Sequence, residues 1–281
     1  MSMDASVLAR PAETKPVQPT ISVHGLWKIF RHESGRDVEA LRDVSFDVPD
    51  GQLVCLVGPS GHGKTTLLNV IAGLLAPTRG EILVRGRKVV GPGADRGLVF
   101  QQDTLFLWRR VKGNVAYGLE ARRVPKADRE RIVAEYLRLV GLTENANFWP
   151  KELSGGMRKR VAVAAVFANN PDVLLMDEPF GSLDYVQRSH LHDVLLDLWQ
   201  RTHKTILFVT HDVEEALVLA DRIIVIANGQ LVDDIAVQFP RPRGEQTLAL
   251  PAAIDIRKRM LEHLGISVSA HQRLRDARPT T

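Results

Sequence analysis

The chain has 281 residues, of which 44% are hydrophobic and 25% are charged, the ordinary composition of a soluble globular protein. Its formal net charge of +4 is too small and too dispersed to indicate nucleic-acid binding. The single cysteine, Cys55, excludes an intramolecular disulfide and lies in an apolar run, so we expect it to be buried in the core. The longest apolar run, residues 161–168, is well short of the roughly 20 residues of a membrane-spanning helix. We therefore expect a cytosolic or membrane-peripheral protein.

The predicted elements alternate along the chain from about residue 20 to residue 240. Residues 1–19 lack the apolar core of a signal peptide and are expected to form a flexible tail. Short apolar runs bounded by turn residues predict strands at 21–26, 44–48, 53–57, 81–84, 97–100, 173–176, 205–209 and 222–227. Amphipathic periodicity predicts helices at 126–142 and 185–201, and a charged helix near 252–264. The pattern indicates an α/β fold with a parallel sheet, interrupted by a helical subdomain at about 102–170 and followed by a C-terminal extension, 241–281.

A glycine-rich loop lies between the strand 53–57 and an apolar helix predicted at 66–74. It reads Gly58-Pro59-Ser60-Gly61-His62-Gly63-Lys64-Thr65 and fits the phosphate-binding pattern G-x-x-x-x-G-K-[ST]. Glycines let successive backbone N–H groups turn toward a phosphate, and the following helix presents its positive end to the same anion. Lys64 supplies a charge to the β- and γ-phosphates, and the Thr65 hydroxyl can ligate Mg²⁺. A glycine turn without a ligand is the alternative, and the flanking strand and helix disfavour it.

Acidic residues end one of the later strands, and a histidine follows the next. Asp177 is placed to hold Mg²⁺, and Glu178 is placed to act as a general base on an attacking water. His211 follows the strand 205–209 and is expected on the same sheet edge as the phosphate loop, within reach of a γ-phosphate. His62, inside the loop, is expected to contribute only its backbone.

The segment Leu153-Ser154-Gly155-Gly156-Met157-Arg158-Lys159-Arg160 carries a resemblance to a known family. Together with the phosphate loop, Gln101, the acidic pair, the segment 181–184 and the histidine, in this order and spacing, it closely resembles the ATP-binding cassette (ABC) family over about residues 20–240. The resemblance implies a P-loop NTPase core of the RecA-like kind, with an antiparallel β subdomain and the inserted helical subdomain. It also implies ATP as substrate and Mg²⁺ as cofactor.

The resemblance assigns expected roles to individual residues. Gln101 matches the loop glutamine that touches Mg²⁺ and water, Asp177 the metal ligand, Glu178 the catalytic base and His211 the switch histidine. Phe30 matches the aromatic residue that stacks on adenine, with Trp27 as the competing choice. The remaining expected nucleotide-binding residues are Thr66, Asp184 and the phosphate loop, and Ser154, Gly155 and Gly156 of the signature that contacts the partner subunit's ATP.

The resemblance further implies partners for the chain. One complete set of motifs implies a homodimer with two shared ATP sites, attached to transmembrane permease subunits and served indirectly by a substrate-binding protein. The expected place is the cytoplasmic face of the inner membrane. The segments 91–101 and 114–120 look like the importer branch for nitrate, sulfonate and taurine. The chain departs from that branch at 105–108, at Arg109, Arg110 and Lys112, and at Lys159, where glutamine is common, which leaves the substrate and the choice of permease open.

Two other classes of function remain as alternatives. A soluble ABC ATPase that acts on DNA or ribosomes usually carries long coiled-coil or zinc-bearing insertions, or two cassettes, and none is apparent in this sequence. A regulatory module that holds ATP without turnover is disfavoured because Glu178 and His211 are both present.

Overall fold

The computed structural model describes residues 18–31, 35 and 37–265. The predicted flexible tail, 1–19, therefore lies almost wholly outside the described residues, and so does the end of the predicted C-terminal extension. Over the described residues, no helix combines the length and the apolar character needed to cross a membrane.

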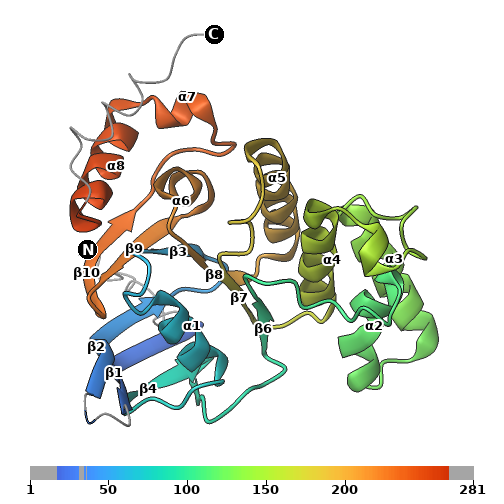
Figure 1. Cartoon of the computed structure of the whole chain (residues 1–281), viewed down its shortest axis with the longest axis horizontal. Helices are drawn as coiled ribbons and strands as arrows, with labels where there is room; N and C mark the ends of the chain where they lie inside the picture. The colour runs from blue at the N-terminus through green and yellow to red at the C-terminus, as the bar shows by residue number, and fades with distance from the viewer. Residues whose placement is uncertain (1–17, 32–34, 36, 266–281) are drawn as a thin grey trace, which may run out of the picture.

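Strands and helices follow one another in an α/β order (Figure 1). The strands are β1 (Ile21–Arg31), β2 (Asp37–Val48), β3 (Leu53–Val57), β4 (Arg79–Val84), β5 (Arg87–Lys88), β6 (Arg96–Val99), β7 (Val173–Asp177), β8 (Thr205–Thr210), β9 (Arg222–Ala227) and β10 (Gln230–Ala236). The α-helices are α1 (Lys64–Ala72), α2 (Val111–Ala121), α3 (Lys126–Leu139), α4 (Gly155–Ala168), α5 (Tyr185–Thr202), α6 (Val213–Leu219), α7 (Glu245–Leu248) and α8 (Pro251–His263), with a 3-10 turn at Pro150–Glu152.

The central sheet of the described residues has six strands in the order β10-β9-β3-β8-β7-β6. The five strands from β9 to β6 are parallel to one another, and β10 pairs antiparallel at one edge. Every residue of β3, β7 and β8 is buried, which explains why these strands are continuous apolar runs in the sequence. A second sheet of the described chain, in the order β2-β1-β4-β5, is antiparallel. The parallel core and the antiparallel subdomain are as predicted.

The alternating side chains of β3 feed two hydrophobic cores of the described residues, one on each face of the central sheet. Leu53, Cys55 and Val57 join the core shared with α2 to α6, whereas Val54 and Leu56 join the core shared with α1 and the antiparallel sheet. This is the period of two that a strand imposes on its side chains. Cys55 is buried as predicted, and burial raises the pKa of its thiol well above the usual value.

The helices α2, α3 and α4 lie between β6 and β7 in sequence and stand together beside the sheet (Figure 1). Of these, α2 has no counterpart among the predicted helices. Gly113 and Gly118 interrupt its apolar pattern, although Gly118 fits because an added Cβ there would lie 2.2 Å from the Asn169 side chain. The short helix α6 and the edge strand β10 were also not predicted. The observed β1 and β2 extend beyond the predicted strands, to Arg31 and from Asp37.

The described part of the C-terminal extension packs on α6 and the neighbouring sheet edge (Figure 1). Arg257 pairs with Glu214 at 3.1 Å, and Arg259 and His263 of α8 both contact the buried carboxylate of Asp233 on β10. The guanidinium of Arg243 donates to backbone carbonyls, and burial is the main cause that lowers its pKa to about 10. Residues 241–265 are therefore docked against the cassette through charged groups.

The core residue Phe208 gives a direct test of the central sheet. Its side chain is fully buried on β8 and its ring centroid lies 5.7 Å from that of Phe180. We expect Phe208→Ala to lower the free energy of unfolding by about 3–5 kcal/mol, because it leaves a cavity between the sheet and the helices. Urea denaturation measures the change. The matched control is Val90→Ala, 93% exposed, which should change the free energy by less than about 0.5 kcal/mol.

Candidate nucleotide-binding and hydrolysis site

The register of three parallel strands brings the predicted motifs to one edge of the sheet. Val57 at the end of β3 is opposite Thr210 of β8, and Val209 of β8 is opposite Asp177 of β7. The phosphate loop, the acidic pair and His211 leave the sheet directly after these positions. The carboxyl edge of a parallel sheet is where open α/β folds bind their ligands.

The phosphate loop is closed by its lysine. Lys64 is buried, and its Nζ donates to the carbonyl oxygens of Gly58 at 2.7 Å and Pro59 at 2.9 Å. Burial lowers the pKa of the Lys64 ammonium, and the charges of Glu178 and Asp177 oppose that change. The Lys64 ammonium is thus fixed by two carbonyl oxygens of the loop, and it interacts electrostatically with the carboxylates of Glu178 and Asp177.

Two glycines of this loop are required by close backbone approaches. A Cβ on Gly58 would lie 2.0 Å from the carbonyl oxygen of Ile226 on β9, and a Cβ on Gly63 would lie 2.4 Å from that of Ala40 on β2. Gly63 also has φ of 100°, in the left-handed region that favours glycine. The loop is therefore wedged between the two sheets, with its shape set by both.

Thr65 and Asp177 form an oxygen pair beside the loop. The Thr65 hydroxyl donates to Asp177 Oδ1 at 3.1 Å, from the first turn of α1 to the last residue of β7. Burial raises the pKa of Asp177; the Thr65 hydrogen bond lowers it, and the nearby charge of Glu178 raises it further. A buried carboxylate beside a hydroxyl is a hard oxygen set that a divalent cation would stabilise in its charged form.

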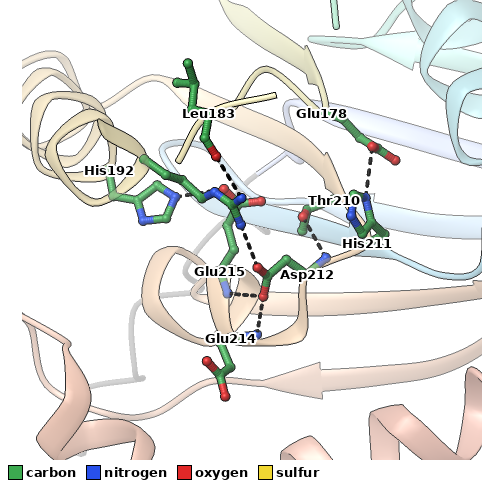
Figure 2. Close-up of polar contacts among 9 residues, drawn as sticks. Glu178, Leu183, His192, Thr210, His211, Asp212, Glu214 and Glu215 are labelled. Atoms are coloured by element: carbon green, nitrogen blue, oxygen red, sulfur yellow. Dashed lines mark hydrogen bonds and ion pairs between the residues drawn. The ribbon is translucent and has the colours of Figure 1, made fainter. Parts of the chain in front are cut away.

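Glu178 and His211 meet across the same edge. His211 Nδ1 lies 2.9 Å from Glu178 Oε2, and the His211 side chain is exposed (Figure 2). Glu178 has a positive φ of 41°, uncommon for a residue with a side chain, and its N–H donates to Val209 O at 3.0 Å. Backbone strain of this kind concentrates at functional sites, where the surrounding structure enforces it.

The signature residues lie on the other side of the central sheet. Ser154 caps α4 and its Oγ accepts from the Met157 N–H at 3.3 Å, while Gly156 is packed beside Gln187 of α5. The buried residues of α4 belong to one hydrophobic core, and those of α1, after the phosphate loop, belong to the other. The structure therefore does not bring the signature together with the phosphate loop of the same chain.

The remaining predicted site residues take varied positions. Phe30 is partly exposed near the end of β1, with Lys28 Nζ 5.0 Å from its ring centroid. Phe30 is opposite Val38 of β2, two residues before Ala40, whose carbonyl oxygen approaches Gly63 of the phosphate loop. Asp184 caps α5 by accepting from the Gln187 N–H at 2.9 Å. His62 Nδ1 accepts from the Asn228 N–H at 3.1 Å, which agrees with a structural part for this side chain.

Gln101 is exposed after β6, and a charged cluster that the sequence did not reveal holds its backbone. Lys159 Nζ, on the first turns of α4, donates to the Gln101 carbonyl and lies 3.3 Å from Asp103 Oδ1. Arg158 donates to the other Asp103 oxygen at 2.7 Å. Burial raises the pKa of Asp103, and the bonds and charges of Arg158 and Lys159 lower it by more. Lys159 thus joins the Gln101 loop to α4.

Residues 41–181 match the family described as ABC transporter. The chain belongs to the ABC transporter family. It is 49% identical over 207 residues to the taurine import ATP-binding protein TauB of Roseobacter denitrificans, covering 74% of this chain and 77% of that protein. It is 44% identical over 222 residues to the nitrate import ATP-binding protein NrtD of Synechocystis sp., covering 78% and 83%.

A solved structure supports the same assignment. The dimeric post-hydrolysis state of an ATP-binding cassette bound to ADP and Pi matches with a TM-score of 0.70 at 30% identity, covering 78% of this chain and 100% of that one. This ABC protein is therefore a nucleotide-binding ATPase, and its P-loop α/β fold is confirmed.

The Lys159 contacts give a prediction for this ABC cassette. Lys159→Ala removes a buried donor and leaves the Gln101 carbonyl and one Asp103 oxygen less satisfied. We expect a loss of about 1–3 kcal/mol in the free energy of unfolding by urea denaturation. The control is Lys126→Ala, which breaks an exposed pair with Glu130 on α3 and should change it by less than about 0.5 kcal/mol. An equal, small effect in both variants would contradict the structural part given to Lys159.

Proposed function

We propose that this chain is the ATP-hydrolysing subunit of an importer for a small organic or inorganic anion of the taurine, sulfonate or nitrate kind. The carrying observation is the alignment of the phosphate loop, Asp177, Glu178 and His211 on one sheet edge, in a chain 44–49% identical to relatives named as taurine and nitrate import ATP-binding proteins. The chain would work at the cytoplasmic face of a membrane, bound to permease subunits.

In this proposal the phosphate loop holds the ATP and Glu178 starts its hydrolysis. Lys64 and the backbone N–H groups of the phosphate loop, which Pro59 alone lacks, neutralise the phosphate charge, and Phe30 stacks on the base. Glu178 accepts a proton from a water that attacks the γ-phosphorus as the bond to the β-γ bridging oxygen breaks, giving ADP and phosphate. The 2.9 Å contact with His211 supports an orienting part for the histidine, which would also reach the γ-phosphate.

The oxygen donors at the site suit a magnesium ion. Thr65 and Asp177 would hold it, with Gln101 as a further ligand from its loop. Bound Mg²⁺ supplies positive charge that stabilises the phosphate oxygens. Burial raises the pKa of the Asp177 carboxyl, and a bound cation would favour its charged form.

We further propose that two copies of the chain share two ATP molecules. The signature 154–156 and the phosphate loop belong to opposite faces of the central sheet, so one chain does not close both around one nucleotide. The α4 N-terminus, with Ser154 at the cap, would present N–H groups to the γ-phosphate held by the partner. The dimeric state of the similar solved cassette supports this arrangement.

An exposed aromatic patch on the helical subdomain supports a permease partner. Leu107 and Trp108 are 68% and 72% exposed, and Phe106 stacks between Trp108 and Tyr117 with centroid distances of 5.3 and 4.5 Å. Exposed apolar surface of this kind marks a protein interface. The substrate-binding protein would act through the permease. The alternative of a soluble ABC ATPase on nucleic acid or ribosomes has no comparable support, because the named relatives are import subunits.

Substitution of the proposed base tests the hydrolytic site. Glu178→Gln should keep ATP binding and lower kcat by about 10²–10⁴-fold, the usual contribution of a general base. It should also leave an ATP-bound dimer that size-exclusion chromatography detects. Wild-type turnover in this variant would remove Glu178 from the part of base.

The lysine of the phosphate loop tests nucleotide binding separately. Lys64→Ala should abolish binding of a fluorescent ATP analogue or its turnover, because the buried ammonium is the charge nearest the loop's centre. Lys88→Ala, which breaks an exposed pair with Glu81 on the antiparallel sheet, is the control and should bind as wild type. Normal ATPase activity of Lys64→Ala would contradict the site.

Transport is tested in cells that carry the gene. Deletion should abolish uptake of one of labelled taurine, an alkane sulfonate or nitrate, and a wild-type copy but not the Glu178→Gln copy should restore it. Unchanged uptake of all three in the deletion would contradict the proposed substrate class.

A further inference from the structure

The guanidinium of Arg188 connects two loops of the site that are far apart in sequence. Arg188 lies in the first turns of α5, where its Nη2 donates to the carbonyl of Leu183 at 3.1 Å and its Nη1 donates to Asp212 Oδ2 at 2.9 Å. The loop 181–184 follows Glu178, and Asp212 follows His211 (Figure 2). One planar side chain thus spans both loops with its two terminal nitrogens.

Asp212 makes hydrogen bonds through both its carboxylate and its backbone N–H. A shift of Arg188, which binds this carboxylate, would therefore move the backbone of the adjacent His211. Asp212 Oδ1 accepts from the N–H groups of Glu214 and Glu215 at 2.9 and 3.1 Å and caps α6. Its own N–H donates to Thr210 Oγ1 at 2.9 Å, at the end of β8. Residue 211 therefore lies between two fixed residues (Figure 2).

These contacts close a ring that begins and ends at Glu178. From Glu178 the backbone turns through Gly181 N–H to Glu178 O, at 3.2 Å, and Leu183 N–H to Phe180 O, at 3.1 Å. Arg188 then carries the connection from Leu183 to Asp212, and His211 returns it to the Glu178 carboxylate. The loop, the guanidinium and the two proposed catalytic side chains form one continuous network.

A second contact keeps the helices that carry this ring together. His192 of α5 lies 2.7 Å from the buried carboxylate of Glu215 on α6 (Figure 2). The His192 ring also packs on Phe180, with centroids 5.8 Å apart. The His192–Glu215 contact holds α5 against α6 one turn after Arg188. A movement of the loop 181–184 would therefore shift Asp212 instead of making the two helices slide past each other.

We propose that Arg188 is a positioning residue that sets the Glu178–His211 geometry from the position of the loop 181–184. The proposal rests on the proposed roles of Glu178 and His211. The loop 181–184 is exposed at Gly181, Ser182 and Asp184 and lies beside the signature residue Gly155, whose added Cβ would be 3.8 Å from Leu183. A second copy that seats on the signature therefore also meets this loop, and Arg188 passes that contact to the catalytic pair.

The chemistry of the side chain makes arginine the suitable residue here. Only a planar fork with two terminal nitrogens reaches the Leu183 carbonyl and the Asp212 carboxylate together at hydrogen-bond distance. A lysine carries the same charge from a single nitrogen, so it keeps the pairing with Asp212 and gives up the bond to the loop. Comparison of Arg188 with Arg188→Lys thus separates the effect of the positive charge from the effect of the double hydrogen bond to Leu183 and Asp212.

Steady-state kinetics of three variants tests the proposal. Arg188→Ala and Arg188→Lys should both lower kcat by about 10–100-fold, the scale of a small misplacement of catalytic groups. The KM for ATP should stay within about three-fold of wild type, because the phosphate loop is untouched. Asp212→Asn keeps the cap of α6, since asparagine caps as well as aspartate, and should lower kcat similarly. The double variant Arg188→Ala/Asp212→Asn should lose no more than Arg188→Ala alone.

Matched controls come from the same helix. Arg201 and Asp197 form an exposed pair on α5 with an Nε–Oδ distance of 2.9 Å, and Arg201→Ala and Asp197→Asn should leave kcat unchanged. Rates are expressed per ATP-binding site by nucleotide titration, so a loss of folded protein alone does not lower kcat. If Arg188→Ala does not fold, the lysine and asparagine variants carry the test.

The outcomes separate this inference from the proposed function. Wild-type kcat in Arg188→Lys, or additive losses in the double variant, would overturn the bridge while leaving the hydrolytic site intact. Wild-type kcat in both Glu178→Gln and His211→Ala would instead contradict the proposed roles on which the inference rests. Reduced kcat with unchanged KM in Arg188→Lys and non-additive losses would support it.

Discussion

The parallel hydrogen-bonding of β3, β8 and β7 is the constraint on which the site depends. Its register sets Val57 opposite Thr210 and Val209 opposite Asp177, so the phosphate loop leaves the sheet beside two segments that follow it by more than a hundred residues. The strands are buried on both faces, and neither face can slip without exposing apolar side chains. The geometry of the proposed catalytic residues is therefore fixed by the packing of the core.

The charged groups at this edge of the sheet are compensated by one another, because burial keeps them partly from solvent. The buried Lys64 ammonium faces the carboxylates of Asp177 and Glu178, and each of these groups bears on the pKa of another. The proposed phosphates and cation would suit this site, because they would complete a set of charges whose desolvation the fold has already imposed. The positive φ of Glu178 shows backbone strain that the surrounding sheet maintains.

Charged side chains also join the site to the parts of the molecule that we propose meet partners. Lys159 and Asp103 connect the Gln101 loop to the signature helix, and Arg188 connects the loop 181–184 to Asp212. Each of these contacts joins a segment near the proposed nucleotide, the Gln101 loop or the His211–Asp212 turn, to a segment proposed to meet the partner copy, α4 or the loop 181–184. Signals between ATP and partners would thus travel through specific bonds that substitutions can remove one at a time.

The sequence by itself determined the strand-loop-helix pattern of 53–74, the acidic strand end at Asp177 and Glu178 and the α/β alternation of strands and helices, because these follow from local spacing and periodicity. It did not reveal α2, whose Gly118 suits the packing against Asn169 rather than helix propensity. Only the tertiary structure decided that Arg188 meets Asp212 and that Lys159 meets the Gln101 carbonyl, since segments distant in sequence become neighbours only when the sheet brings their loops together. It likewise set the signature and the phosphate loop on opposite faces of the central sheet, because alternating side chains of one strand build two separate cores.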